Sequence, residues 1–402
     1  MNLSRSLALA LSSSTLTTVE GCSRVFQNKY DPKELDGGVG DSSVTWTSQY
    51  GSVTSSAAGF FMGENPKGAS YGYVPPGAAC TPTSFGDDLT TDGVNEAGLG
   101  AHLLYLGHED GTEWVTEPSD EPIDISVARW IRYVLDNFAT VDEAVTAMSG
   151  LKTRQEAVCR VDGDTEDELN GFVFGLHMAI EDATGDSAVV EHVGGVWQFY
   201  HNKDGLNTEV MTNDPTFDKH KEFLSQYEHW GGDKPLDDKH LPGGTNSPAR
   251  FLRLEYLLHY TPEPKNSIEA IANVRSMINN SNVPFGAPYK DGVYPTWWTS
   301  FIDTQDKVYY FDWLYTPNMI WIRLEDIDWE TLEAPLYLDP KHDVDLAGHV
   351  LCDFMTHDDE DPGLPVCNEE GDDDEEGDDE EGYDEEEGDE EEAGGPYLRQ
   401  TF

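Results

Sequence analysis

Cys22 is the residue whose place in the sequence most strongly suggests nucleophilic chemistry, because the segment before it resembles a cleavable leader. Arg5 is followed by an apolar stretch at residues 7–11, a run rich in Ser and Thr, and the short end Val19-Glu-Gly21. This order is typical of a secretory signal peptide. We therefore expect residues 1–21 to be removed, the mature protein to be secreted to an extracellular or periplasmic medium, and Cys22 to become its first residue.

A cysteine at the start of a mature chain carries two functional groups, its thiol and its own α-amine. The amine has an unperturbed pKa of about 7.7–8.0, so near neutral pH it can take the thiol proton and later return a proton to a leaving amine. This chemistry needs no catalytic histidine, metal or cofactor, and the 12 histidines form no His-Glu-x-x-His motif. Two other interpretations of Cys22 stay open: a disulfide cysteine and a lipid-modified cysteine.

Segments that follow Cys22 resemble, in the same order, those of the choloylglycine hydrolase and penicillin V acylase family, which belongs to the N-terminal-nucleophile (Ntn) hydrolases. The resemblance covers about residues 22–338. Its main segments are Trp46-Thr-Ser-Gln-Tyr-Gly-Ser-Val53, Asp92-Gly-Val-Asn-Glu-Ala-Gly-Leu99, Val210-Met-Thr-Asn-Asp-Pro215 and Ser247-Pro-Ala-Arg-Phe251.

The resemblance implies a fold and an activity. The fold is a four-layer αββα sandwich of two antiparallel sheets flanked by helices. The activity is that of an amidohydrolase whose first residue, Cys22, attacks the carbonyl of a linear amide, so a small-molecule acyl amide is the expected partner. Family substrates include conjugated bile acids, penicillin V and N-acyl homoserine lactones, and nothing in the sequence selects among them. A homo-oligomer is left open.

The resemblance also assigns three further site residues. Asn95, by its backbone or side chain, and Asn213, by its side-chain amide, match positions of the family's oxyanion hole, where donors stabilise the tetrahedral intermediate. Arg250 matches an arginine near the nucleophile, where a cation would favour the thiolate and the neutral amine. The alternatives are an Asn that holds a tight turn and an Arg in an ion pair on a helix surface.

One departure from the family affects the proposed chemistry. The family has an Arg-x-Met-Asp-Trp segment shortly after the nucleophile, and its Asp orients the amine and the thiol; this chain lacks that segment. Asp31, Asp36 or Asp41 could supply the carboxylate instead. Otherwise the chain is a catalytically impaired family member that acts by binding. A third alternative is an acidic, cation-binding extracellular protein in which the tail carries the function.

The periodicity of the chain indicates an α+β fold without reference to any family. Helices are expected at 125–138, from a capping box at Thr140-Val-Asp-Glu143, from Ser247 as N-cap with Pro248 next, and at 267–279. Runs of strands separated by helices favour antiparallel sheets over a doubly wound parallel sheet. Residues 60–90 are expected to form a surface loop, with Asp92-Gly93 as a turn signal. Strands are expected at 44–55, 99–106, 172–180, 188–192, 196–200, 296–302, 307–313 and 319–324.

The charge of the chain excludes some partners. The 402 residues include 78 acidic and 24 basic ones, and 23 of the acidic residues fall within 358–392, where no Lys or Arg occurs. Without these 23, 55 acidic residues remain against 24 basic ones, so nucleic acid and anionic membranes are not expected partners. We expect an amidohydrolase domain over 22–350, a disordered acidic tail over 358–402, and no membrane span.

The five cysteines leave one thiol outside any set of disulfides, and Cys22 is the natural one to leave out. Cys352 with Cys367, and Cys80 with Cys159, are then the expected bridges. Four buried thiols are the alternative.

Overall fold

A computed structural model gives the fold of the chain. It describes residues 23–25, 46–47, 49–56, 60–62, 70–71, 90–106, 124–154, 157–158, 172–173, 175–227, 240–289, 292–293, 295–330, 332, 336–338, 340, 345–356 and 367. The chain divides into two compact units, 1–362 and 363–402, and Cys367 is the one described residue of the second. The leader, Cys22, the candidate carboxylates Asp31, Asp36 and Asp41, and the acidic tail apart from Cys367 all lie outside the described residues.

Within the described residues the larger sheet has nine strands, and every neighbouring pair among them is antiparallel. In spatial order the strands are β14 (Val196–His201), β13 (Ser187–Val193), β12 (Leu176–Glu181), β7 (Gly100–Tyr105), β6 (Thr90–Asn95), β3 (Ser52–Ser56), β4 (Phe60–Met62), β21 (Leu336–Leu338) and β23 (Met355–Thr356).

The part of the chain that the structure describes forms a second sheet of four strands. β18 (Trp298–Asp303), β19 (Val308–Trp313) and β20 (Met319–Arg323) are antiparallel neighbours, and β22 (Gly348–His349) lies parallel to β20. Five further pairs are short: β1 (Ser23–Val25) with β15 (Val210–Thr212), β2 (Trp46–Thr47) with β5 (Ser70–Tyr71), β8 (Ile125–Ser126) with β9 (Thr153–Arg154), β10 (Ala157–Val158) with β11 (Phe172–Val173), and β16 (Pro288–Tyr289) with β17 (Gly292–Val293).

The described helices form two groups along the chain. The first group is α2 (Trp130–Asn137) and α3 (Val141–Met148), and the second is α5 (Phe217–Ser225), α6 (Ser247–Tyr260) and α7 (Ser267–Asn279). Single turns of 3-10 helix occur at η2 (Val127–Arg129), η3 (Asn202–Asp204), η4 (Leu324–Asp326) and η5 (Leu351–Asp353). Among the described helices none is long and apolar enough to cross a bilayer.

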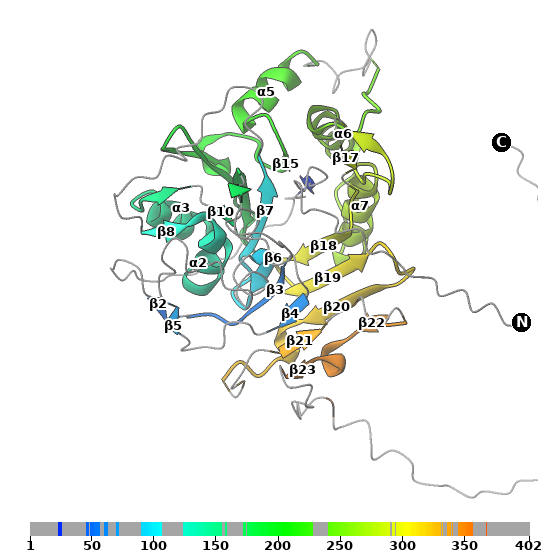
Figure 1. Ribbon diagram of the computed structural model, residues 1–402. Helices are drawn as coiled ribbons and strands as arrows, with labels where there is room; N and C mark the ends of the chain where they lie inside the picture. The colour runs from blue at the N-terminus through cyan, green and yellow to red at the C-terminus, as the bar shows by residue number, and fades with distance from the viewer. Residues whose placement is uncertain are drawn as a thin grey trace, which may run out of the picture. The chain divides into compact units, whose positions relative to one another are not determined.

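Alternation along the strands of the nine-stranded sheet produces two separate cores. Ala101 and Leu103 of β7 pack with α2 and α3, whereas Leu104 faces the opposite side with residues of α6, α7 and β18. Figure 1 shows α2 and α3 on one side of the strands and α6 and α7 on the other. The layers are therefore helix, sheet, sheet, helix, and the expected αββα sandwich is confirmed.

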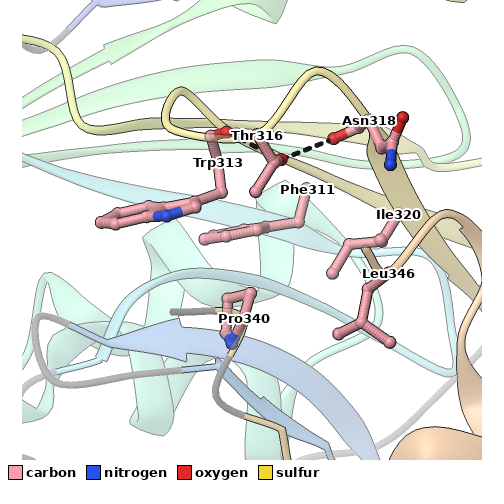
Figure 2. A pocket seen from close by; sticks show the side chains of 7 residues that line it. All are labelled: Phe311, Trp313, Thr316, Asn318, Ile320, Pro340 and Leu346. Atoms are coloured by element: carbon pink, nitrogen blue, oxygen red, sulfur yellow. Dashed lines mark hydrogen bonds between the residues drawn. The ribbon is translucent and has the colours of Figure 1, made fainter. Parts of the chain in front are cut away.

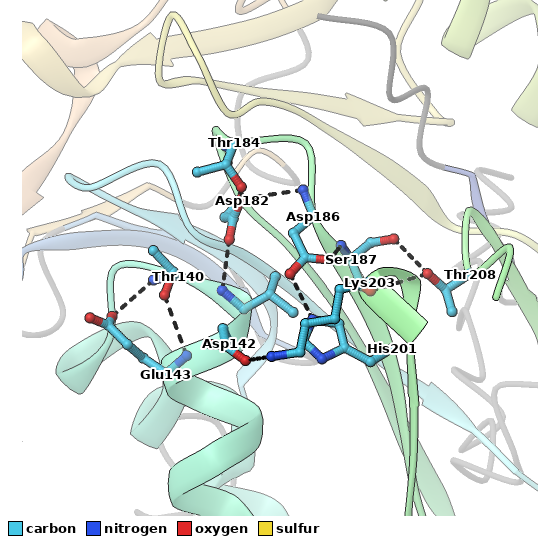
Figure 3. A network of polar contacts seen from close by, with 11 residues as sticks. Thr140, Asp142, Glu143, Asp182, Thr184, Asp186, Ser187, His201, Lys203 and Thr208 are labelled. Atoms are coloured by element: carbon cyan, nitrogen blue, oxygen red, sulfur yellow. Dashed lines mark hydrogen bonds and ion pairs between the residues drawn. The ribbon is translucent and has the colours of Figure 1, made fainter. Parts of the chain in front are cut away.

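The start of α3 is tied to the turn between β12 and β13 by polar groups (Figure 3). Thr140 and Glu143 form the predicted capping box. The Val141 N–H donates to Asp182 Oδ2 at 2.7 Å, which places a carboxylate at the positive end of the helix. Burial raises the pKa of Asp182, although hydrogen bonds from the Val141 N–H and from Thr184 lower it. Part of the free energy of these hydrogen bonds therefore offsets the desolvation of the carboxylate.

Most predicted elements are confirmed, with shifts at their ends. α7 has the predicted bounds, and β7, β13, β14 and β18–β20 match predicted strands within two residues. The N-cap of α6 is Asn246, whose Oδ1 accepts from the Ala249 N–H, so the prediction of Ser247 as N-cap is wrong by one residue. Residues 60–62, predicted as loop, form β4 inside the nine-stranded sheet, and α5 was not predicted.

Asp92-Gly93 was predicted as a turn and instead lies within β6. The glycine serves close packing there, because a Cβ atom on Gly93 would lie 2.6 Å from the Val53 carbonyl oxygen. The real turn follows at 95–99, where Gly98 has a φ of 89°. A left-handed φ at that position favours glycine.

The close packing of Gly51 against the Trp329 indole can be tested by substitution. A Cβ atom on Gly51 would lie 2.0 Å from Cε3 of the Trp329 indole, which is itself held by a hydrogen bond from Nε1 to the Leu324 carbonyl. We expect Gly51→Ala to lower the free energy of unfolding by about 1–3 kcal/mol in urea denaturation. Gly243→Ala is the matched control, because nothing lies within 4 Å of its Cβ position. Equal stability of the two variants would contradict the described packing.

Candidate active site

Asn213 directly follows β15 and lies beneath the first turn of α6. β15 packs on α6, and the Asn213 side chain is 0% exposed. Its Nδ2 donates to the Tyr105 carbonyl at 2.7 Å, at the end of β7. The amide therefore joins β15 to the central strands of the nine-stranded sheet.

Arg250 contacts the other end of the same amide. Its Nη2 donates to Asn213 Oδ1 at 2.7 Å, and its Nε donates to the Thr245 carbonyl at 2.9 Å. The side chain is 1% exposed, so the alternative of a surface ion pair is wrong. The guanidinium has no acceptor atoms, so Oδ1 must be the oxygen of the Asn213 amide.

The local sequence explains why Arg250 reaches this position. Asn246 caps the helix and Pro248 lies in its first turn, so the helix starts at a defined residue. Buried residues then recur at Phe251, Leu254 and Leu258, and this stripe turns the Arg250 side of α6 toward the protein interior.

Asn95 lies at a different place and has its donors in use. Its Nδ2 donates to the carbonyls of Leu135 and Phe138, at 2.8 Å each, and its backbone N–H donates to the Leu99 carbonyl at 3.0 Å. Its Oδ1 accepts from the N–H groups of Ala97 and Leu99. The side chain thus closes the turn between β6 and β7 and binds the C-terminal end of α2.

Asn95 and Asn213 are separated by the length of one strand. Asn95 bonds to Leu99, before β7 begins, whereas Asn213 bonds to Tyr105, at the end of β7. Six extended residues span roughly 20 Å. The expectation that both asparagines line one oxyanion hole therefore needs correction: the structure brings Asn213 and Arg250 together, and it leaves Asn95 in the turn-holding role that was the alternative.

The turn that contains Asn95 contacts Gly51 and lies near Tyr50. The Glu96 N–H donates to the Gly51 carbonyl, and the Gly51 N–H donates to Glu96 Oε1. Burial, followed by the negative charges of Glu143 and Glu96, raises the pKa of Tyr50. Tyr50 is therefore a neutral phenol at physiological pH.

The strand that follows Cys22 runs beside Asn213. β1 pairs with β15 in antiparallel register, with Ser23 opposite Thr212 and Val25 opposite Val210. Cys22 itself lies outside the described residues, but it is the residue before Ser23, and Asn213 is the residue after Thr212.

A small cavity of about 10 Å³ lies elsewhere, at the ends of β19 and β20. Figure 2 shows it between Phe311, Ile320, Pro340 and Leu346. It has room for one water and is far below the roughly 300–1,000 Å³ of a small-molecule site. It is therefore not a substrate pocket.

Two of the five cysteines, Cys352 and Cys367, lie within the described residues. Cys352 and Cys367 are both disulfide-bonded, as expected, whereas Cys80 and Cys159 lie outside the described residues. Within the described ranges no three His, Cys, Asp or Glu side chains are grouped to hold a metal ion.

Three residues next to Asn213 were missed in the sequence. They are Tyr105, Thr212 and His220, and all three contact Asn213 or its neighbours. Thr216 and the acidic first turn after it indicate the start of α5, but no motif marks His220 itself. Tyr105 acts through its carbonyl, and a backbone contact leaves no signal in the residue type.

Comparisons with known proteins agree with this architecture. The family model of the linear amide C-N hydrolases, choloylglycine hydrolase family, matches residues 80–337, a range that includes Asn95, Asn213 and Arg250 but not Cys22. Penicillin V acylase from Pectobacterium atrosepticum is 34% identical over 313 residues, 74% of this chain and 73% of that protein. Bile salt hydrolase/transferase from Clostridium perfringens is 28% identical over 255 residues, 58% of this chain and 72% of that protein.

Solved structures extend the likeness to the fold. Penicillin V acylase from Agrobacterium tumefaciens has a TM-score of 0.54 and 29% identity, over 77% of this chain and 90% of that one. A variant of conjugated bile acid hydrolase from Clostridium perfringens has a TM-score of 0.51 and 20% identity, over 74% of this chain and 91% of that one, and shows the fold alone. Two mainly antiparallel sheets between helix layers thus define an α+β protein with the Ntn-hydrolase fold. The chain belongs to the choloylglycine hydrolase family of linear amide C-N hydrolases.

The structural role of Asn95 predicts a large stability effect for an isosteric change. Asn95→Asp replaces the two amide donors by an acceptor that faces the Leu135 and Phe138 carbonyls. We expect a loss of about 3 kcal/mol or more in the free energy of unfolding, measured in urea. Asn202→Asp, at a partly exposed position, should change it by less than about 0.5 kcal/mol. If Asn95→Asp unfolds at the wild-type midpoint, the turn does not depend on this side chain.

The buried hydrogen bonds of Arg250 predict that Arg250→Lys lowers the free energy of unfolding more than a lysine at an exposed arginine does. In Arg250→Lys one ammonium replaces a guanidinium that donates both to Asn213 Oδ1 and to the Thr245 carbonyl. The variant should lose about 1.5–3 kcal/mol in the same assay, because a buried acceptor of a charged hydrogen bond is left without its donor. Arg323→Lys, on the exposed end of β20, is the control and should unfold like the wild type.

Proposed function

We propose that this protein is a secreted cysteine Ntn amidohydrolase, in which Cys22 is the nucleophile that cleaves a linear amide of a small acyl substrate. Membership of the linear amide C-N hydrolases supports hydrolysis of an amide. The pairing of β1 with β15 is the observation that supports Cys22. If its register continues by one residue, Cys22 lies opposite Asn213.

Residues directly opposite in an antiparallel pair project to the same face, with Cα atoms about 4.5–5.5 Å apart. The Cys22 thiol would then share a face with the buried Asn213 amide, which is held between Arg250 and Tyr105. This supports a site in which the Asn213 amide nitrogen stabilises the oxyanion formed by attack of Cys22.

The reaction then proceeds in two steps. The α-amine of Cys22 takes the thiol proton, and the thiolate adds to the amide carbonyl carbon. The tetrahedral intermediate collapses as the C–N bond breaks, and the ammonium returns its proton to the leaving amine. Water, deprotonated by the same amine, hydrolyses the thioester and releases the acid. Arg250, buried behind Asn213, supports the negative charges of both steps.

The names of the relatives suggest which substrates to try. Penicillin V and conjugated bile salts are indicated by the penicillin V acylases and the bile salt hydrolases that this chain resembles. N-acyl homoserine lactones are a third class implied by the family resemblance. All three present a linear amide next to an acyl group, so they test the same chemistry.

The nucleophile is tested by comparing protein that starts at Cys22 with protein that carries Met-Gly before it. The added residues keep the thiol but remove its α-amine, so hydrolysis of penicillin V should fall on the order of 10³-fold or more, as should hydrolysis by Cys22→Ala. N-terminal sequencing of secreted protein and alkylation with iodoacetamide check the processing and the thiol. Equal activity of the two forms would contradict the role of the α-amine.

A further inference from the structure

The backbone at Asn213 is held by a histidine that carries none of the chemistry described above. His220 Nε2 lies 3.0 Å from the Asn213 carbonyl oxygen. A carbonyl can only accept, so Nε2 must carry the hydrogen. This contact is with the main chain, whereas Arg250 and Tyr105 hold the Asn213 side chain.

The plane of the His220 ring is set by its packing. The ring stacks on Phe251 of α6, with centroids 4.5 Å apart and planes inclined by 17°. His220 is 1% exposed, and Phe251 is 0% exposed. A ring confined in this way can point Nε2 in few directions, and one of them is toward Asn213.

The helix that carries His220 is itself anchored to the nine-stranded sheet. The N–H of Phe217, the first residue of α5, donates to Glu191 Oε1 at 3.0 Å, and the same oxygen lies 3.1 Å from His177 Nδ1. Phe217 and His220 share the buried face of α5, whereas Asp218 and Lys219 are exposed. The hydrogen bond to Glu191 of β13 therefore fixes the start of α5, and with it the position of His220.

The same nitrogen lies at the junction of β15 and α6. His220 Nε2 is 3.4 Å from both the Thr212 and the Ser247 hydroxyl oxygens, which are 2.8 Å from each other. Thr212 pairs with Ser23, the neighbour of Cys22. The imidazole thus contacts the last residue of β15, the first residue of α6 and the backbone of Asn213.

We propose that His220 is a positioning residue: its Nε2–H holds the Asn213 main chain so that the side-chain amide meets the oxyanion. This inference rests on the proposed function, because it assigns Asn213 to the oxyanion. It requires a donor at the Nε2 position only. Gln can place its amide nitrogen near the Nε2 position, whereas Asn can place its amide nitrogen only near the Nδ1 position. Both substitutions introduce an amide, but only His220→Gln keeps a donor that can reach the Asn213 carbonyl.

The test compares His220→Gln, His220→Asn and His220→Ala in the processed protein that begins at Cys22, with penicillin V as substrate and melting temperature as a check of folding. His220→Gln should stay within about threefold of the wild-type kcat. His220→Asn and His220→Ala should lose about ten- to a hundredfold in kcat with little change in KM, because a misplaced donor weakens the transition state more than the ground state. His259→Asn, an exposed histidine on α6, is the control and should not change either constant.

Two results separate failure of this inference from failure of the proposed function. If the wild type is active and His220→Asn equals His220→Gln, the positioning role is overturned. If the wild type hydrolyses no acyl amide, the proposed function fails, and the ¹H–¹⁵N signal of the Asn213 side-chain amide decides the inference. That signal, assigned by its loss in Asn213→Asp, should be preserved in His220→Gln and shifted in His220→Asn; identical spectra would overturn the positioning role.

Discussion

The hydrogen bond from Arg250 Nη2 to Asn213 Oδ1 decides which end of the Asn213 amide faces which neighbour. The guanidinium only donates, so the amide oxygen must meet it and the nitrogen must turn toward the Tyr105 carbonyl. Reversing the amide would set donor against donor and acceptor against acceptor in a buried place, so both of these hydrogen bonds would be lost. One contact thus orients α6, β15 and β7 at their meeting point.

Burial gives this contact its strength, and the layered fold provides the burial. One face of the nine-stranded sheet is covered by α2 and α3, and the other packs on β18 of the second sheet together with α6 and α7. Leu103 and Met178 therefore face α2, whereas Leu104 and Ala179 face the opposite core. In such surroundings hydrogen bonds are stronger than in water, and unpartnered polar groups are costly. The same rule explains the fully bonded Asn95 side chain at the opposite end of β7.

The sequence predicted those parts of the structure that depend on local patterns. The bounds of α7, the capping box before α3 and the hairpin strands β18, β19 and β20 follow from spacing within a few residues. β4 was not predicted: it pairs with β3 on one side and with β21 on the other, and the pairing with β21, more than 270 residues along the chain, leaves no signal in the local sequence. The prediction of a turn at Asp92-Gly93 was wrong for the same reason. Gly93 allows the backbone of β3 to pack closely against β6, and the local sequence does not show this contact.

Some residues of the candidate site could be predicted from the sequence and others could not, because some of their contacts join distant parts of the chain. Asn213 and Arg250 were identified through a family resemblance, and the structure brings them together. The resemblance gave Asn95 a role at the same oxyanion, but only the path of β7 reveals that the two asparagines lie at opposite ends of a strand. His220 carries no motif, because its contact is to a backbone atom.

The order of strands in the nine-stranded sheet also bears on how the chain folds during synthesis. Strands β6, β7, β12, β13 and β14 are contiguous in the sheet and are complete once residue 201 has been made. β3 and β4 join them on one side, but the outer edge of β4 pairs with β21, residues 336–338, and β23, residues 355–356, pairs with β21 in turn. That edge must therefore wait, unpaired, while most of the chain is translated, and such an edge can join any other exposed strand.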